Sequence, residues 1–253
     1  AEVAKDLPPK VESVTCCALE EAQAELYAAL ARKLRAQVLA DVDQKGLAKS
    51  QMSILDALLK LRQICCHPGL VDPKYAKEDS AKMTALFYLL DQLREEGHKV
   101  LVFSQFVSML EIIKNRLEAE NRPLNYLTGQ TKDRRGEIEK FQTTKDPSVF
   151  LLSLKAGGAG LNLTSASYVV LYDPWWNPAV ESQAIDRTHR IGQKNKVIAY
   201  RLLTKDSVEE KIRILQHQKN QLVANVLGDE GFTSSLGIDD LNFILNHGDD
   251  EEG

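Results

Sequence analysis

Features that mark secreted, membrane-bound or strongly basic proteins are scarce in this 253-residue sequence. No apolar run approaches the roughly 18 residues that a membrane-spanning helix needs, and the first residues do not resemble a signal peptide. The formal net charge is −4, so a nucleic-acid partner would have to meet a local patch and not an overall basic field. What remains is an ordinary globular composition, 43% hydrophobic and 27% charged. Because the chain begins at Ala1 and not at a methionine, we expect it to be a piece of a longer protein.

Cysteine is scarce as well, with four residues in two adjacent pairs, Cys16-Cys17 and Cys65-Cys66. The C-x-x-C spacing that zinc sites favour does not occur. Zinc ligation helped by His67 stays open as an alternative, but we expect reduced cysteines in buried apolar positions of a cytosolic protein.

The spacing of apolar residues predicts two structural regions. Residues 20–43 and 51–66 have the pattern of amphipathic helices, and Pro68-Gly69 ends the second, so an antiparallel helical pair is expected over 19–67. Beyond Pro73, short apolar runs alternate with helical segments, which is typical of a parallel sheet covered by helices on both faces, an α/β fold. The predicted strands span 11–19, 99–103, 124–127, 149–152, 168–172 and 197–203, and the predicted helices of this region span 80–96, 108–118, 132–141, 179–190 and 208–227.

Three predicted strands are followed by polar, glycine-rich or aromatic residues, at the carboxyl ends where open parallel sheets bind ligands. Glycine lets backbone N–H groups approach an anion closely, and a lysine beside it suits phosphate. A tight turn without a ligand is the alternative interpretation of the glycines. The three segments are Ser104-Gln105-Phe106, Lys155-Ala156-Gly157-Gly158-Ala159-Gly160 and Asp173-Pro174-Trp175-Trp176-Asn177-Pro178.

Two parts of a nucleotide site are missing. The chain has no G-x-x-x-x-G-K-[ST] loop, and no strand ends in the acidic residues that hold magnesium. It therefore lacks the groups that cradle a nucleotide's phosphates and its metal.

Gln183, Arg187 and Arg190 follow one another at spacings of four and three, so they share one face of a predicted helix. Such a face suits an oxygen-rich anion, and arginines there can neutralise charge that develops during phosphoryl transfer. An ordinary solvated basic face is the alternative. For Trp175 and Trp176 we expect one ring to fill the core and the other to stack against nucleic acid.

Six segments resemble, in the same order, the second-lobe motifs of the SWI/SNF family of DNA-dependent ATPases. They are LRQICCHP at 61–68, VFSQF at 102–106, LTGQT at 127–131, SLKAGGAGLNL at 153–163, DPWWNP at 173–178 and QAIDRTHRIGQ at 183–193. The resemblance covers roughly residues 6–227, and the last two segments are its most specific part.

That family consists of two-lobed, helicase-like ATPases, so the resemblance implies a RecA-like fold. It implies that ATP and Mg²⁺ bind mostly on a first lobe of the same protein and that double-stranded DNA is the other partner, with no membrane and a monomeric state. The implied catalytic residues are Arg187, Arg190 and Gln183, and the implied nucleotide-binding residues are Gly158, Gly160 and Asn162. The implied DNA contacts are Ser104, Gln105, Thr128, Gly129, Ser153, Lys155 and Trp176, and no metal ligand is expected in this chain.

The resemblance also suggests an organisation into four parts. They are a linker and first strand at 1–18, a helical protrusion at 19–72, a RecA-like lobe with a brace helix at 73–227, and an acidic, partly flexible tail at 228–253 with one weak helix pattern at 236–245. The short protrusion suggests a bacterial or archaeal member, cytoplasmic and nucleoid-associated; a eukaryotic one would be nuclear.

Two positions depart from the family pattern. Thr128 stands where many members have an acidic residue, and Lys155 where some have arginine, whose planar fork a lysine cannot reproduce. Two alternatives remain: a lobe of a DEAD-box RNA helicase, whose arginine motif usually ends in Gly-Arg and not in Gly192-Gln193, and a non-catalytic module that binds DNA or protein.

Overall fold

A computed structural model describes residues 8–157, 161–190, 192–219, 232–233 and 235–246. The chain forms two compact units. The first, which we call the sheet unit, comprises Ala1–Thr15, Met83–Trp175 and Ala179–Leu202, and the second, the helical unit, comprises Cys16–Lys82, Trp176–Pro178 and Leu203–Gly253. The chain therefore passes from one unit to the other within the Trp-containing segment.

A six-stranded sheet with the order β1-β6-β5-β2-β4-β3 forms the centre of the sheet unit. The four central pairings are all parallel. Edge strand β1 runs in the same direction as β6, since the N–H of Val197 donates to the carbonyl of Pro9 at their common start. The strands are β1 (Lys10–Cys17), β2 (Val100–Ser104), β3 (Leu124–Leu127), β4 (Val149–Ser153), β5 (Tyr168–Leu171) and β6 (Val197–Thr204).

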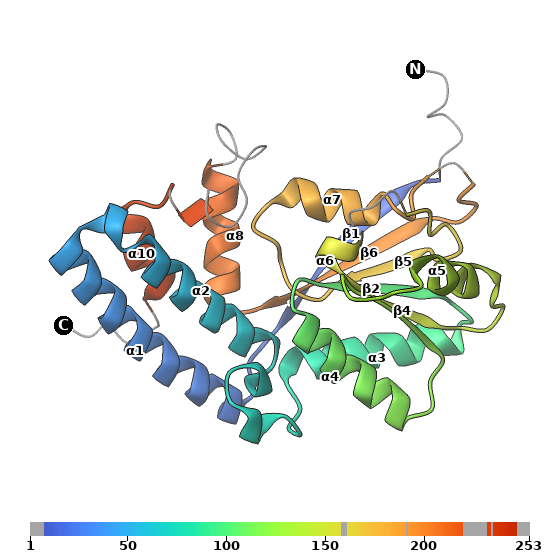
Figure 1. Cartoon of the computed structure of the whole chain (residues 1–253), viewed down its shortest axis with the longest axis horizontal. Helices are drawn as coiled ribbons and strands as arrows, with labels where there is room; N and C mark the ends of the chain where they lie inside the picture. Colours follow the sequence, from blue (N-terminus) through green and yellow to red (C-terminus); the bar gives the residue numbers. More distant parts are fainter. Residues whose placement is uncertain (1–7, 158–160, 191, 220–231, 234, 247–253) are drawn as a thin grey trace, which may run out of the picture. The chain divides into compact units, whose positions relative to one another are not determined.

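Both faces of this sheet are covered, which explains why β2 and β4 are apolar at nearly every position. On one face Leu101 and Phe103 of β2 pack with Phe141 of α5 and Ile185 of α7. Helices α3 and α4 lie on the opposite face (Figure 1). These helices are α3 (Ala81–Glu95), α4 (Val107–Ala119), α5 (Arg134–Thr143), the short α6 (Leu154–Gly157) and α7 (Pro178–Ile185).

In the helical unit, α1 (Glu21–Lys45) and α2 (Gln51–Cys66) form a hairpin through the 3₁₀ turn η2 (Leu47–Lys49). Helices α8 (Val208–Lys219) and α10 (Ile238–Leu245) contribute to the same apolar core. The segment after α2 forms two further 3₁₀ turns, η3 (Pro68–Leu70) and η4 (Pro73–Tyr75). The buried ring of Trp176 belongs to this core.

The predicted α/β fold is confirmed, as is the helical pair near the amino terminus. Most boundaries agree within two residues, but the helix expected over 179–190 ends at Ile185. The sequence grouped the helix at 208–227 with the sheet, whereas its described part, α8, packs in the helical unit. Its last residues, 220–227, lie outside the described part of the chain.

The expected burial of all four cysteines is corrected at Cys16, which is exposed, while Cys17, Cys65 and Cys66 are buried. Cys16 lies on β1, where successive side chains point to opposite faces, so only one member of that pair can face the core. Within the described residues, no helix has both the length and the apolarity to cross a bilayer.

Candidate nucleotide and nucleic-acid site

The parallel register brings the predicted site residues to one edge of the sheet. Ser104 at the end of β2 pairs with Ser153 at the end of β4. Leu127 of β3 pairs with Leu152, so Thr128 lies beside Ser153 at the same edge. Phe103 pairs with Leu171, which places Asp173 there as well. Segments far apart in the sequence therefore meet where sheets of this kind bind ligands.

The buried carboxylate of Asp173 joins two of these strand ends. It accepts the Ser104 hydroxyl, the backbone N–H of Gln105 at 3.2 Å and the Gln105 side-chain amide at 2.7 Å. The Ser104 oxygen in turn accepts the N–H of Phe106 at 3.1 Å. Ser104 is fully buried, so its hydroxyl fixes the loop after β2 and does not face solvent. Asp173 was absent from the predicted site residues.

The loop after β3 is shaped by its own threonines. The N–H of Thr128 donates to the hydroxyl oxygen of Thr131 at 2.9 Å, and the Thr128 hydroxyl accepts the N–H of Gln130 at 3.3 Å. Gly129, between them, is exposed, and a methyl group there would meet nothing within 4 Å. The backbone of a bound nucleic acid can therefore approach this loop closely.

The loop after β4 is held from α5. Arg134 donates to the carbonyl of Ala156 at 2.7 Å. Ser153 is buried, and its oxygen accepts the N–H of Ala156 at 3.4 Å. Lys155 lies in α6, between these two residues. Gly158 and Gly160 lie outside the described residues, while Asn162 is exposed and its carbonyl accepts the Gln142 amide at 2.6 Å.

Arg187 and Arg190 do not continue the helix that carries Gln183. Because α7 ends at Ile185, both arginines stand on the turn that follows it, and the expectation of one shared helix face is wrong. The Nε of Arg190 donates to the carbonyl of Asp186 at 3.1 Å. The carbonyl of Arg187 accepts the N–H of Leu163 at 3.1 Å, which ties the turn to the segment after the glycines.

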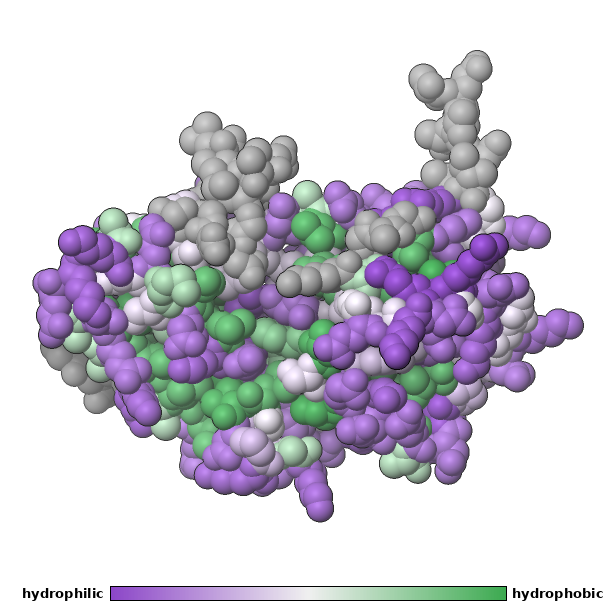
Figure 2. All heavy atoms as spheres, in the orientation of Figure 1, coloured by the Kyte–Doolittle hydropathy of each residue, from purple (hydrophilic) through white to green (hydrophobic). Residues whose placement is uncertain are grey.

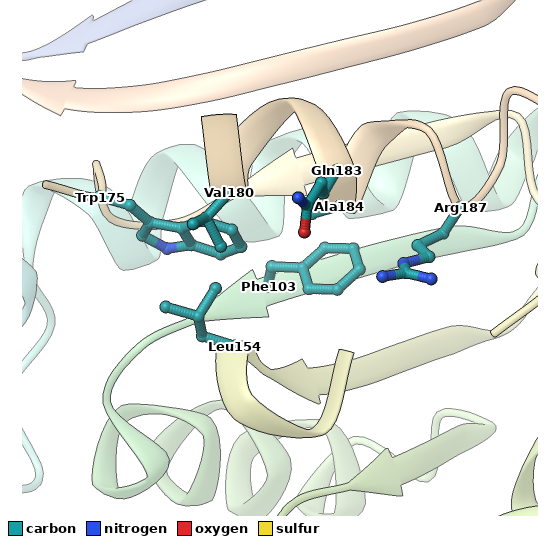
Figure 3. Close-up of a pocket in the computed structure, with 7 residues that line it drawn as sticks. All are labelled: Phe103, Leu154, Trp175, Val180, Gln183, Ala184 and Arg187. Atoms are coloured by element: carbon teal, nitrogen blue, oxygen red, sulfur yellow. The ribbon is translucent and has the colours of Figure 1, made fainter. Parts of the chain in front are cut away.

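A small pocket of about 20 Å³ opens beside this turn. Its lining combines the side chains of Gln183 and Arg187 with apolar groups from the ends of β2, β4 and β5 (Figure 3). The lining residues are Phe103, Leu154, Trp175, Val180, Gln183, Ala184 and Arg187. Arg187 is only 6% exposed. Burial first, and then repulsion from Arg190, lower the pKa of Arg187, although Asp186 opposes this.

Gln193, the last residue of the arginine motif, is buried and holds neighbouring segments together through its side-chain amide. The sequence did not predict this role. The Gln193 amide donates to the carbonyls of Ala166 at 2.9 Å, Thr188 at 3.2 Å and Thr164 at 3.3 Å. Gly192 before it has φ +103°, a conformation that side chains rarely adopt. These two residues close the arginine turn against residues 164–166.

Both tryptophan rings are buried, Trp175 at 3% and Trp176 at 6% exposure. Trp175 packs edge-to-face on Phe103, with ring centroids 6.2 Å apart. Trp176 lies against the Arg62 guanidinium at 4.4 Å and against Phe232 at 4.9 Å. The expectation that one ring is free to stack on nucleic acid is therefore wrong, because each ring is buried in the core of its own unit.

The polar groups at the pocket are the Arg187 guanidinium and the Gln183 amide, set among five apolar side chains. Guanidinium and amide groups at the pocket match anionic oxygen atoms. Within the described ranges, no three His, Cys, Asp or Glu side chains come together as metal ligands, and this holds for the cysteine pairs as well.

Comparison with known families matches residues 81–192 to the helicase conserved C-terminal domain and residues 1–70 to the SNF2-related domain. Fold and site thus define a helicase-type C-terminal lobe. The C-terminal domain of the Sulfolobus solfataricus SWI2/SNF2 ATPase is 34% identical, with a TM-score of 0.76, and the match covers 93% of this chain and 97% of that domain. The chain belongs to the SWI2/SNF2 ATPase family.

Two further relatives extend the comparison. The SWI2/SNF2 ATPase core of Sulfolobus solfataricus in complex with dsDNA is 34% identical with a TM-score of 0.80, over 96% of this chain and 52% of that one. An uncharacterised ATP-dependent helicase of Mycoplasma genitalium is 37% identical over 95% of this chain. The chain spans 23% of that relative's length and 27% of the length of a putative ATP-dependent helicase/translocase of Bacillus subtilis.

Proposed function

We propose that this chain is the second lobe of an ATP-dependent double-stranded DNA translocase and that it supplies the arginine half of the ATP site. Relatives named as ATP-dependent helicases support ATP use, and a related core with bound dsDNA supports the choice of polymer. The chain by itself would not hydrolyse ATP, because it has no phosphate-binding loop of the Walker type.

One observation carries the proposal: the side chains of Arg187 and Gln183 line the same pocket at the carboxyl edge of the sheet. Arg190 stands three residues further along the same turn, and its backbone-anchored Nε leaves the outer guanidinium nitrogens available for an anion. Guanidinium groups held on one turn can neutralise the negative charge that develops during phosphoryl transfer.

The residues of this lobe have distinct roles in the proposed cycle. ATP bound between two lobes supplies the phosphoanhydride bond whose hydrolysis drives the cycle, and its Mg²⁺ belongs to the first lobe. When the lobes close, Arg187 and Arg190 donate to phosphate oxygens and stabilise the charge that develops there. Gln183 contributes its side-chain amide to the polar side of the pocket. Gln193 fixes the arginine turn through its hydrogen bond to the Ala166 carbonyl.

The DNA would be met by the loops after β2, β3 and β4. Gly129 is exposed and Gln105 is partly exposed, with its amide held by Asp173. Lys155 is the one cation among the proposed contacts. Ser104 and Ser153 are buried and hold these loops in place. Trp176 acts as an anchor for its segment and not as a stacking platform. Phosphate contacts carry no sequence information, so base identity is not read.

The proposal is tested by ATP turnover of a protein extended upstream through the first lobe. Rates are compared without nucleic acid, with duplex DNA and with single-stranded RNA. We expect strong stimulation by duplex DNA alone. Stimulation by RNA alone would replace the proposal with an RNA-helicase lobe. Binding of DNA without turnover in any condition would replace it with a binding module.

A further inference from the structure

The first described residues of the chain contact the arginine turn at two points and, through Arg201, the first turn of α7 at a third. The carbonyl of Pro8 accepts the Nε2–H of His189 at 2.7 Å. The Nζ of Lys10 lies 3.3 Å from a carboxylate oxygen of Asp186. Asp186 and His189 are sequence neighbours of Arg187 and Arg190, so these two contacts touch the residues that flank both guanidinium groups.

The third contact acts through Arg201 of β6. Its Nη1 lies 2.5 Å from Glu12, and its Nε lies 2.8 Å from Glu181 in the first turn of α7. The other oxygen of Glu181 accepts the backbone N–H of Trp175 at 2.9 Å. Arg201 thus joins β1, the start of α7 and the segment that holds Trp175, all within the sheet unit.

Strand geometry explains why Lys10 and Glu12 act on the same side of β1, because the side chains of alternate residues in a strand point to the same face. Pro8, just before the strand, makes its contact through its backbone carbonyl. Because β1 is held beside β6 by its backbone, its side chains are presented at fixed positions. Burial opposes the charge of Arg201, but Glu181 and Glu12 outweigh it and raise the pKa of Arg201.

We infer that the segment Pro8–Glu12, which we call the strap, positions the arginine turn for ATP hydrolysis. Lys10, Glu12 and Arg201 are positioning residues: they touch no phosphate but set where Arg187 and Arg190 stand. The inference rests on the proposed function.

The test removes both strap side chains, Lys10→Ala with Glu12→Ala, in the protein extended upstream, at saturating duplex DNA. We expect kcat to fall about tenfold, because small displacements of catalytic groups cost rate steeply. The half-saturating concentrations of ATP and DNA should stay within twofold, since neither residue binds them. The single variant Lys10→Ala should lose part of the rate and Lys10→Arg should keep it.

The matched control is Asp56→Ala with Lys60→Ala, which removes an ion pair of 2.8 Å on the surface of α2. It should leave kcat unchanged. The inference is overturned by an unchanged kcat in the strap variant, or by a loss that Lys10→Arg shares or that a lowered melting temperature accompanies. In those cases the unaltered protein still hydrolyses ATP in the presence of DNA, so only the inferred role of the strap is rejected. If the unaltered protein does not hydrolyse ATP, the proposed function is rejected as well.

Discussion

Arg187 and Arg190 are close in sequence but differ in their surroundings. Arg187 is almost wholly buried at the wall of the pocket, beside Phe103 and Trp175. Arg190 is exposed and anchored to its own turn through the Asp186 carbonyl. Arginine keeps its charge in both settings. In the proposed cycle both guanidinium groups would meet phosphate oxygens, Arg187 from the wall of the pocket and Arg190 from an exposed position that leaves its side chain more room to move.

The first prediction at the residue scale concerns Arg190. Arg190→Ala in the upstream-extended protein should lower kcat by about a thousandfold or more, the range in which arginine fingers act. The dissociation constant for duplex DNA should change by less than about threefold, because the proposed DNA contacts lie on other loops. An ATP-turnover assay measures kcat, and fluorescence anisotropy measures the dissociation constant for duplex DNA.

Arg94→Ala is a suitable control, since Arg94 is an exposed arginine of α3 outside the proposed site. Its kcat should equal that of the unaltered protein. Equal losses of DNA affinity and turnover in Arg190→Ala would argue that Arg190 binds DNA and has no role at the phosphate.

At the scale of elements, one buried ion pair joins Lys82 to Glu209 in the first turn of α8, and both residues belong to the helical unit. Lys82 and Glu209 are both 0% exposed, and their charged atoms lie 2.7 Å apart. Burial opposes the charge of Lys82, but the Glu209 carboxylate outweighs it and raises the pKa of Lys82. Glu209 also accepts the N–H of Thr204 at 2.9 Å, so it fixes the end of β6 as well.

We predict that Lys82→Met destabilises the fold by about 3–5 kcal/mol, because it leaves a buried carboxylate without its cation. Lys82→Met combined with Glu209→Gln should recover much of that loss, since the amide oxygen can still accept from Thr204. Urea denaturation measures both. A double variant as unstable as the single one would show that the loss comes from packing and not from charge.

At the scale of the whole molecule, the residues proposed to contact DNA carry little positive charge. Hydrophilic side chains dominate the visible face of the sheet unit (Figure 2), but the net charge of the chain is −4. The proposed contacts Gln105, Thr128 and Gly129 are uncharged residues. Only a cation that neutralises a phosphate releases counterions, so this lobe should contribute little to the salt dependence of binding.

The corresponding prediction is made for duplex DNA binding by the upstream-extended protein. Lys155→Gln should reduce the slope of log affinity against log salt by about one, the share of a single phosphate contact. Gln105→Ala should weaken binding without changing the slope. If the slope fell equally in both variants, the change would come from a rearrangement of the loops and not from the loss of one phosphate contact.

Much of this architecture could be predicted from sequence because local signals and global fold agree. The runs KVLVF and VFLL are apolar throughout since helices cover both faces of the sheet, and Pro68 ends α2 at the expected place. The carboxyl-edge cluster followed from the rule that parallel strands end together. The family was recognisable from motif order alone.

What the sequence could not supply depends on contacts between distant residues. Asp173 and Ser104 meet across 69 positions, and no periodicity marks that bond. The end of α7 was misplaced because Asp186 to Arg190 have helical spacing, whereas the carbonyl of Arg187 bonds to Leu163 from another loop. Both tryptophan rings are buried by partners, such as Arg62 and Phe232, that no local pattern identifies.

The position of β1 has a consequence for the order of events during synthesis. Within this chain the strap is synthesised before the arginine turn, since His189 follows Pro8 by 181 residues. At about 5–20 residues per second, the strap waits roughly 10–40 s for that partner. Edge strand β1 spends that interval without β6 beside it. The contacts between the strap and the arginine turn therefore form only after most of the sheet unit has been synthesised.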